Sequence, residues 1–401
     1  MSSSKVTIIG AGVSGLAIAQ TLSAFPVDLT LIEQNPYPGG RAAFYGCKAT
    51  DSCVHCGVCL LREAVAQMPD GGRVRHLYSS APVSADHGTN GGYAIEVSGR
   101  PNRIDPELCT ACGACLEACP EGAIEMVPGW RYFVGEKCTD CGKCVDVCPT
   151  SAIAMKRQPL HETIDADAVV VSTGFTPFDP AIDRKWGYGD SPRVITSSDL
   201  ERLLFEERYL PEGIKADEAK KVAFIQCVGS RNVLEGTDQC SRICCAYNLR
   251  MAGRLKDELP EADIDFYYMD IQHFGKGFPS FFEGVKEKLN LVRSLPISIE
   301  HDEGNRPILR FESIPEPGCA DTPYDLVVLS QGLQPAANAI RIADQWGLDL
   351  DSNGFFRTTE ADMPPGVFAS GTCTGPMRID ECVENAASVS EGVLKYLGVS
   401  T

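Results

Sequence analysis

The sequence predicts an α/β fold in which two Rossmann-like halves follow one another, with a small cysteine-rich domain inserted into the first. Three observations carry this prediction. A glycine-rich turn joins an apolar strand to a helix within residues 6–24, and another apolar strand opens a second half at Lys221–Ile225. Between them lie two copies of one cysteine spacing. The strand–helix–strand order of residues 6–32 is a βαβ unit, which is typical of parallel sheets.

The N-terminal βαβ unit carries a dinucleotide-binding pattern. Its turn has the spacing G-x-G-x-x-G, and its second strand ends at an acid, Glu33. Glycines permit a tight turn and the close approach of the backbone to a pyrophosphate at the helix N-terminus. The acid can accept hydrogen bonds from ribose hydroxyls. The pattern predicts a bound dinucleotide without choosing between FAD and NAD.

The residues after Glu33 select FAD. The segment Glu33–Arg41 resembles the E-x(4–5)-G-G-R segment of flavoproteins with two dinucleotide-binding domains, and Val169–Gly174 resembles their middle element. Gly366–Gly371 resembles their late flavin signature, although Thr372 replaces the acid that binds the ribityl chain. A helix from about 381 to 396 would point its N-terminus at the flavin. We expect FAD to be held by Gly10, Gly12, Gly15, Glu33, Gln34, Gly40, Arg41, Val83, Thr173, Gly174, Gly371 and Thr372.

The two cysteine runs each read C-x2-C-x2-C-x3-C-P, the pattern that holds paired [4Fe–4S] clusters. Short loops direct three thiolates to one cubane, while the fourth cysteine reaches the other. A zinc ribbon or a disulfide framework is disfavoured, because zinc sites use two C-x2-C pairs. We expect one cluster on Cys109, Cys112, Cys115 and Cys148, and the other on Cys138, Cys141, Cys144 and Cys119.

Two further cysteine sets have irregular spacing. From spacing alone, Cys227, Cys240, Cys244 and Cys245 are either cluster ligands or buried cysteines on a helix at 241–255. The set Cys47, Cys53, Cys56 and Cys59 predicts a fourth cluster, with a reduced structural loop or a reactive thiol pair as alternatives; His55 is a less favoured ligand. The remaining cysteines, Cys319, Cys373 and Cys382, stand apart and are expected to be inert.

The second half lacks a phosphate-binding turn. The strand Lys221–Ile225 continues into Gln226-Cys227-Val228-Gly229 without G-x-G-x-x-G, so NAD(P)H binding in this half is disfavoured. The histidines, which number 6, form no catalytic motif, and neither a nucleophile triad nor a carboxylate dyad is evident. We therefore expect no catalytic residues beyond the cofactors.

Much of the chain resembles the HdrA family, the flavin-containing A subunits of heterodisulfide reductase. The segments 226–231 and 240–247 look like the flavin-proximal cluster motif of that family, and 274–278, 354–356 and 369–376 match its habits. The resemblance implies a thioredoxin-reductase-like two-dinucleotide-binding-domain flavoprotein with an inserted bacterial-type 2[4Fe-4S] ferredoxin domain. It also implies a third cluster on the Cys227 set. Arg250 lies where the family commonly has a lysine near the flavin, and Lys276 is a second flavin-proximal candidate.

The expected domains follow from these motifs. They are an FAD-binding domain at 1–102 including the Cys47–Cys59 loop, the ferredoxin domain at 103–157, an FAD-domain return at 158–200, the second Rossmann-like domain at 201–324 and the rest of the FAD-binding domain at 325–401. The chain begins at the flavin strand and ends after the flavin helix, so we expect a compact form of the family. Compact relatives include the flavin subunits of the quinone-interacting oxidoreductase and the HdrA-like subunits of sulfur oxidisers.

Composition limits the location and the partners. No apolar run approaches the roughly 18 residues that span a bilayer, and no signal peptide is evident. We expect a cytoplasmic protein, attached to a membrane only through partners. The net charge of −18 argues against nucleic acid as a partner.

The predicted function is electron transfer between FAD and [4Fe–4S] clusters, to partner subunits of a heterodisulfide-reductase-like complex. The resemblance implies HdrB-type, HdrC-type or quinone-reactive iron–sulfur partners in a hetero-oligomer that contains a dimer of this chain. The first alternative is a stand-alone NAD(P)H-dependent oxidoreductase that resembles the glutamate synthase small subunit. The second alternative is a ferredoxin scaffold with an empty flavin site.

Overall fold

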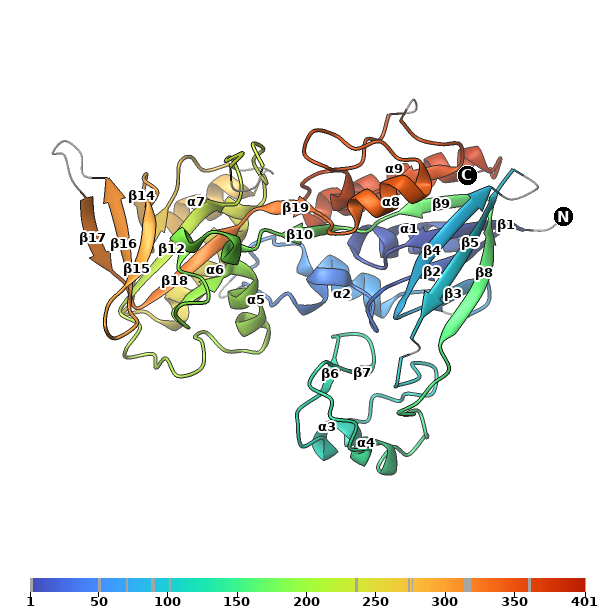
Figure 1. Cartoon of the computed structure of the whole chain (residues 1–401), viewed down its shortest axis with the longest axis horizontal. Coiled ribbons are helices and arrows are strands. Elements are labelled where there is room, and N and C mark those ends of the chain that lie inside the picture. Colours follow the sequence, from blue (N-terminus) through green and yellow to red (C-terminus); the bar gives the residue numbers. More distant parts are fainter. Residues whose placement is uncertain are drawn as a thin grey trace. The chain divides into compact units, whose positions relative to one another are not determined.

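The computed structural model describes residues 3–49, 52–69, 71–87, 91–100, 102–234, 237–272, 275, 277–312, 319–359 and 362–400. The chain forms two compact units, drawn in Figure 1. Unit 1 comprises Met1–Ala43, Cys59–Gly174 and Ala336–Thr401, and unit 2 comprises Phe44–Val58 and Phe175–Pro335. The predicted domain limits kept the Cys47–Cys59 loop with the FAD-binding domain, whereas residues 44–58 pack within unit 2.

Unit 1 is built on a parallel five-stranded sheet with the order β20-β9-β1-β2-β3. Its central strands are buried apolar runs, as expected where both faces of a parallel sheet are covered. The helices α1 and α9 pack against each other. The strands are β1 (Ser4–Ile9), β2 (Val27–Ile32), β3 (Val74–Leu77), β9 (Ala168–Val171) and β20 (Val367–Ala369), and the helices are α1 (Val13–Ser23), α2 (Val58–Ala66), α8 (Ala339–Trp346) and α9 (Ile379–Tyr396).

A second sheet of unit 1 is antiparallel and has the order β4-β5-β8. Its strands are β4 (Ser80–His87), β5 (Tyr93–Gly99) and β8 (Leu160–Ala166). Ile95 and Val97 of β5 share a core with Ile9 of β1 and with α8. The flavin helix, expected from about residue 381, begins at Ile379 because Arg378 and Glu381 form a capping box one turn earlier.

The cysteine-rich insertion leaves the antiparallel sheet after β5 and returns at β8. It contains α3 (Ala114–Ala118), α4 (Lys143–Asp146) and the hairpin β6 (Ile124–Met126) and β7 (Tyr132–Val134). An isolated bridge joins Ile104 to Ile153. Its small core combines Ile104, Ile124 and Ile153 with Cys115 and Cys144. The cluster cysteines thus supply part of the limited apolar packing that so short a domain can make.

Unit 2 contains a second parallel five-stranded sheet, with the order β11-β18-β12-β13-β14. One core joins this sheet to three helices, and another joins it to an antiparallel sheet. The parallel strands are β11 (Val194–Thr196), β12 (Lys221–Val228), β13 (Asp263–Tyr267), β14 (Asn290–Val292) and β18 (Leu326–Gln331). The helices are α5 (Ser197–Phe205), α6 (Cys244–Glu258) and α7 (Phe278–Lys286), and the antiparallel strands are β15 (Ser298–His301), β16 (Pro307–Glu312) and β17 (Cys319–Pro323).

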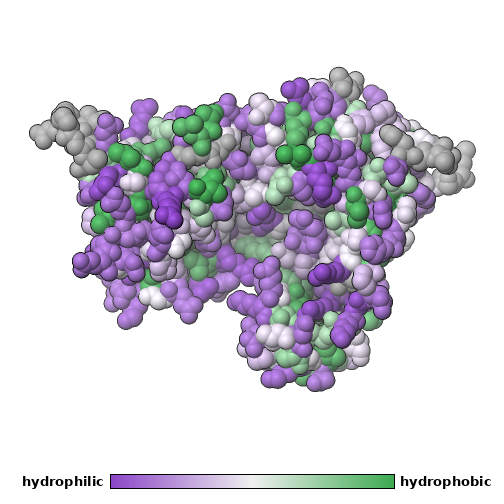
Figure 2. Space-filling view, viewed as in Figure 1, coloured by the Kyte–Doolittle hydropathy of each residue, from purple (hydrophilic) through white to green (hydrophobic). Residues whose placement is uncertain are grey.

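Short elements complete the chain, and polar groups dominate the face drawn in Figure 2. In unit 2, β10 (Phe175–Pro177) pairs with β19 (Leu333–Pro335). The 3-10 turns are η1 (Gly40–Phe44), η2 (Pro180–Ile182), η3 (Arg184–Trp186) and η4 (Gly371–Thr374). Among the described residues, no helix has the length and apolar character that crossing a membrane requires.

Candidate functional site

The glycine-rich turn of unit 1 divides its glycines into two kinds. Gly10 has φ of 101°, and a Cβ there would lie 2.3 Å from the carbonyl oxygen of Ser172. A Cβ on Gly15 would lie 1.9 Å from the carbonyl oxygen of Gly10. A Cβ on Gly12 would meet no atom within 4 Å. Gly10 and Gly15 are thus required by the packing of the turn, whereas Gly12 borders open space at the N-terminus of α1, where no side chain caps the helix. A pyrophosphate fits such a space.

Glu33 lies at the end of β2 beside this turn. Its side chain accepts hydrogen bonds from the backbone N–H of Ala11 at 2.8 Å and from the backbone N–H and side chain of Asn35, both at 2.8 Å. The residue is 4% exposed, and burial raises the pKa of its carboxyl group. These bonds fix the carboxylate at the position where the acid of a Rossmann turn accepts from a ribose.

The G-G-R segment folds back onto the turn. The N–H of Gly39 donates to the carbonyl of Ala11 at 2.7 Å. Gly40 has φ of 56°, and a Cβ on it would lie 3.2 Å from the Cα of Gly12. Gln34 and Arg41 flank this contact along the chain, and Arg41 is exposed. Val83, the remaining candidate from this part of the chain, lies at a bulge in β4 with 54% of its surface exposed.

The end of β9 and the start of η4 meet within unit 1. A Cβ on Gly174 would lie 3.8 Å from the Oγ1 of Thr372. The side-chain oxygen of Asn385 accepts from the N–H of Gly371 at 2.9 Å. The hydroxyl oxygens of Ser172 and Thr173 are buried without a hydrogen-bond partner in the described structure. Buried hydroxyls are ordinarily paired, so these orphans, together with the uncapped helix and the space at Gly12, fit a bound dinucleotide.

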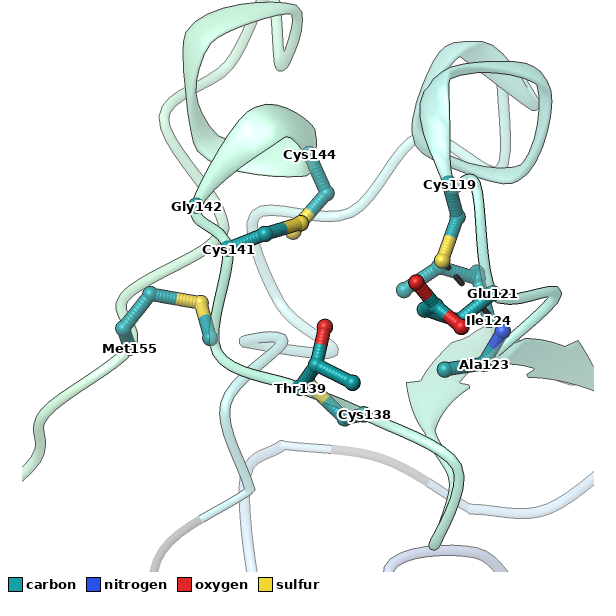
Figure 3. Close-up of a pocket in the computed structure, with 10 residues that line it drawn as sticks. All are labelled: Cys119, Glu121, Ala123, Ile124, Cys138, Thr139, Cys141, Gly142, Cys144 and Met155. Carbon is teal, nitrogen blue, oxygen red and sulfur yellow. Dashed lines mark hydrogen bonds between the residues drawn. The ribbon is translucent and has the colours of Figure 1, made fainter.

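Four cysteines of the insertion surround one pocket (Figure 3). Cys119 comes from the end of α3, and the other three come from the loop and first turn that form α4. Thr139, Met155 and Ile124 complete part of the wall. The structure therefore gathers Cys119 with Cys138, Cys141 and Cys144, the grouping that the spacing predicts for one cubane.

The two cysteine runs have nearly identical local structures. In each, the residue before the second cysteine has positive φ, 54° at Ala111 and 58° at Asp140. The following glycine also has positive φ, and the third cysteine is the second residue of a helix. The fourth cysteine accepts an N–H···S hydrogen bond of 3.3 Å, from Ala123 to Cys119 and from Ala152 to Cys148.

Burial affects the thiols of this insertion unevenly. It raises the pKa of Cys115 to about 11, with a further contribution from the nearby Cys109. Hydrogen bonds, of which the largest comes from Thr150, outweigh burial at Cys148 and lower its pKa. Thiolates are the ligands of iron–sulfur clusters, and N–H···S bonds tune their potentials, so the loops supply both ligands and tuning groups.

The Cys53–Cys59 loop repeats the same conformation, which the sequence reasoning did not detect. His55 precedes the second cysteine with φ of 50°, and Gly57 follows it with φ of 82°. Cys59 is the second residue of α2. The N–H of His55 donates to the Sγ of Cys53 at 3.4 Å. The signal available in the sequence was C-x2-C-G-x-C, which this loop shares with both runs of the insertion. Asp51, beside this loop, lies outside the described residues.

The Cys227 set lies in unit 2 at the end of its central strand. Cys227 lies near the end of β12 with φ of 63°, and Cys244 and Cys245 begin α6. Cys240 accepts a 3.3 Å hydrogen bond from the N–H of Arg242. The helix begins at residue 244 rather than 241 because Arg242 has φ of 57°, which is not helical.

The four thiols of this set interact electrostatically. Burial raises the pKa of Cys227 to about 12, and the neighbouring Cys245 and Cys240 raise it further. A hydrogen bond between Cys244 and Cys245 raises the pKa of the first and lowers that of the second. The structure thus brings together the four cysteines that the sequence analysis grouped.

A charged pair lies beside these thiols. The guanidinium of Arg231 donates to the carboxylate of Asp270, and this bond lowers the pKa of Asp270. Arg231 also interacts with Cys227 and Cys240. Lys276, one of the two flavin-proximal candidates, lies outside the described residues. Arg250, the other, lies on α6 in unit 2.

The space that a nucleotide would need at this strand end is filled. Residues 229–243 separate β12 from α6, whereas a phosphate-binding turn leads directly into its helix. A Cβ on Gly229 would lie 1.9 Å from the ring of Phe178, so that ring packs directly onto the glycine. Cysteines thus occupy the place of a glycine-rich cradle.

Comparisons with known proteins agree with both the fold and the sites. Residues 108–153 match the model of the 4Fe-4S dicluster domain, and residues 8–78 match that of the NAD(P)-binding Rossmann-like domain. The fold is similar to that of T. acidophilum thioredoxin reductase, with a TM-score of 0.56, 13% identity and coverage of 98% of this chain and 99% of that one. Thioredoxin reductase from Lactococcus lactis gives a TM-score of 0.53, 13% identity and the same coverage. The predicted thioredoxin-reductase-like fold is therefore confirmed.

Sequence relatives extend over almost the whole chain. The second of the iron–sulfur A subunits of CoB–CoM heterodisulfide reductase from Methanopyrus kandleri is 31% identical, over 96% of this chain and 63% of its own length. The iron–sulfur A subunit of the Methanocaldococcus jannaschii enzyme is 30% identical over the same shares. This chain thus spans slightly less than two thirds of the curated relatives it matches. With both cofactor folds in place and this similarity along its length, the chain belongs to the HdrA family of heterodisulfide reductase subunits.

Proposed function

We propose that the chain is an electron-transfer subunit that exchanges electrons between FAD and [4Fe–4S] clusters within a heterodisulfide-reductase-like complex. One observation carries the proposal. Cys227, Cys240, Cys244 and Cys245 gather at the end of β12, where an NAD(P)H-dependent relative would need a glycine-rich turn. A flavoprotein that replaces its nicotinamide cradle with cluster ligands exchanges electrons through iron–sulfur carriers.

The residues that would hold each cofactor are those that the structure gathers. The uncapped N-terminus of α1 and the space at Gly12 would take the pyrophosphate of FAD, and Glu33 would take a ribose. Ser172, Thr173, Gly371 and Thr372 offer hydrogen-bonding groups to the rest of the cofactor. When bound, a flavin can hold two electrons whereas a cluster takes one, so together they convert between the two kinds of carrier.

The chain's own contribution is to place and tune these groups. The N–H donors of Ala123 and Ala152 stabilise thiolate charge on Cys119 and Cys148. Arg231 places a permanent positive charge near Cys227 and Cys240, and Asp270 holds that guanidinium in position. Burial of Cys227, Cys244 and Cys245 excludes water from this site. These effects set the driving force for electron transfer without any acid–base residue.

Four clusters are proposed. Three use the cysteines of the insertion and the Cys227 set. The fourth uses Cys47, Cys53, Cys56 and Cys59, and the repeated loop conformation at His55 and Gly57 supports it. We further propose iron–sulfur or quinone-reactive partner subunits, and a cytoplasmic location.

Chemical analysis of the anaerobically prepared protein tests the proposal. The wild-type chain should contain one FAD and about 16 Fe. Cys244→Ser should lose or alter one cluster, so that iron falls by up to about 4 per chain while FAD is retained. Unchanged iron content and unchanged cluster spectra in Cys244→Ser would contradict a cluster at this strand end.

A further inference from the structure

The segment that carries Cys47, Cys53 and Cys56 is attached to unit 2 by polar bonds. We call residues 44–58 the cysteine arm; residues 50 and 51 are not described. The buried Nζ of Lys48 donates to Glu201 of α5 at 2.6 Å, and the N–H of Gly46 donates to the same carboxylate oxygen at 2.8 Å. Arg254 of α6 donates to the carbonyl of Ala49 at 3.1 Å. The arm is therefore fixed to α5 and α6 before it reaches its second cysteine.

A second arginine of α6 binds the cysteine loop itself. The Nε of Arg250 donates to the carbonyl of Val54 at 2.8 Å, and its Nη2 donates to the carbonyl of His55 at 3.3 Å. These are the two residues between Cys53 and Cys56. The guanidinium also lies 5.2 Å from the centroid of the Phe281 ring on α7, which limits its movement. One side chain thus fixes two consecutive carbonyls of the loop.

The same helix begins with ligands of the other irregular site. Cys244 and Cys245 form its first two residues, and Arg250 follows five residues after Cys245. At 1.5 Å per residue, that separation is about 7.5 Å along the helix axis. A single rigid element therefore carries two cysteines of one site and the residue that binds the loop of the other.

We infer that Arg250 is a positioning residue for the Cys53–Cys56 loop and an electrostatic determinant of the cluster bound there. This inference rests on the proposed fourth cluster. Reduction makes a cluster more negative, so a nearby guanidinium stabilises the reduced form and raises the midpoint potential. Because arginine stays protonated at all ordinary pH values, its contribution does not change with pH.

A redox titration followed by EPR tests the inference on the full chain. Arg250→Gln removes the charge, and Arg250→Lys keeps it with a different donor geometry. Lys256→Gln is the matched control, because Lys256 is on the same helix but bonds the carbonyls of Pro260 and Ala262. The signal of the loop cluster is identified by its loss or alteration in Cys56→Ser.

Arg250→Gln should lower the midpoint potential of that one signal, with the equilibrium constant for its reduction falling about tenfold, or ~59 mV for a one-electron couple. Arg250→Lys should restore most of the shift, and Lys256→Gln should leave the potential unchanged. About 16 Fe in the wild type and in Arg250→Gln, with no shifted potential, would overturn the inference alone. About 12 Fe in the wild type would overturn the fourth cluster itself.

Discussion

At the scale of single residues, unusual backbone angles mark the places where cofactors would bind. Ala111, Asp140, His55, Cys227 and Arg242 all have positive φ without being glycine. Such conformations are unfavourable by about 1–3 kcal/mol each and persist only where the surroundings require them. Each of these residues is a cysteine of a proposed cluster site or lies within two residues of one, so the strain is consistent with loops shaped around thiolates.

The glycines of the first turn allow a paired test. Gly12→Ala should leave the apoprotein within about 1 kcal/mol of the wild type, because the added Cβ meets no atom within 4 Å, yet it should weaken FAD binding. Gly10→Ala should destabilise the apoprotein by about 2 kcal/mol or more, because its Cβ would clash with the Ser172 carbonyl. Thermal unfolding and flavin titration separate the two effects. Full FAD affinity in Gly12→Ala would contradict the assignment of this space.

Two buried thiols near the flavin elements should be unreactive. Burial raises the pKa of Cys373 to about 12 and that of Cys382 to about 11, so both stay protonated as the pH rises through 8. Because the thiolate is the nucleophile, alkylation of native Cys373 at pH 8 should be at least about a thousandfold slower than in the unfolded chain. Mass spectrometry of peptides after brief iodoacetamide treatment measures this, and rapid modification of the native protein would contradict it.

At the scale of elements, the cysteine loops form short, repeated units that lead into helices. The sequence spacing was sufficient to predict which cysteines of the insertion share a pocket, because the motif itself prescribes the exchange of the fourth ligand. The path of the cysteine arm was not predictable. Its attachment depends on Glu201, Arg250 and Arg254, which are distant in sequence and belong to no motif.

The exchange of the fourth ligand leads to a specific expectation. Cys119→Ser should alter the cluster held by Cys138, Cys141 and Cys144, since these residues share the pocket with Cys119, and should leave the Cys109–Cys115 cluster intact. EPR of the reduced protein distinguishes the two, with Cys148→Ser as the reciprocal variant. Both variants altering the same signal would contradict the exchange.

The buried pair at the base of the arm should dominate the arm's stability. Lys48 and Glu201 have side chains that are only 2% and 3% exposed. Lys48→Met leaves the carboxylate buried and unpaired, which should destabilise the protein by about 3–5 kcal/mol. Lys48→Met combined with Glu201→Leu should recover most of this loss, whereas Arg310→Gln at a partly exposed pair should change stability by less than about 1 kcal/mol. Anaerobic denaturant titrations give these values, and a double variant as unstable as the single one would be the contrary result.

At the scale of the whole molecule, the FAD-binding fold and the inserted ferredoxin domain follow from the sequence, because glycine turns and cysteine runs encode local geometry. The helix boundaries were displaced by two to three residues where capping and positive φ decided them, at Ile379 and Cys244. The division into units could not be predicted, since residues 44–58 leave the first Rossmann half to pack in unit 2.

The central claim is that this flavoprotein exchanges electrons through its clusters and not with a nicotinamide. The filled space at Gly229 and the cysteines at the end of β12 lead to this claim. It predicts different responses to one-electron donors and to hydride donors, because only the former can use the cluster ligands.

Anaerobic stopped-flow spectroscopy of the FAD- and cluster-loaded protein is the most direct test. Reduced methyl viologen, a one-electron donor, should bleach both the cluster absorbance and the flavin band near 450 nm. NADH and NADPH should leave both bands unchanged over the same time. Rapid reduction of the flavin by either nicotinamide would contradict the account and favour a stand-alone NAD(P)H-dependent oxidoreductase.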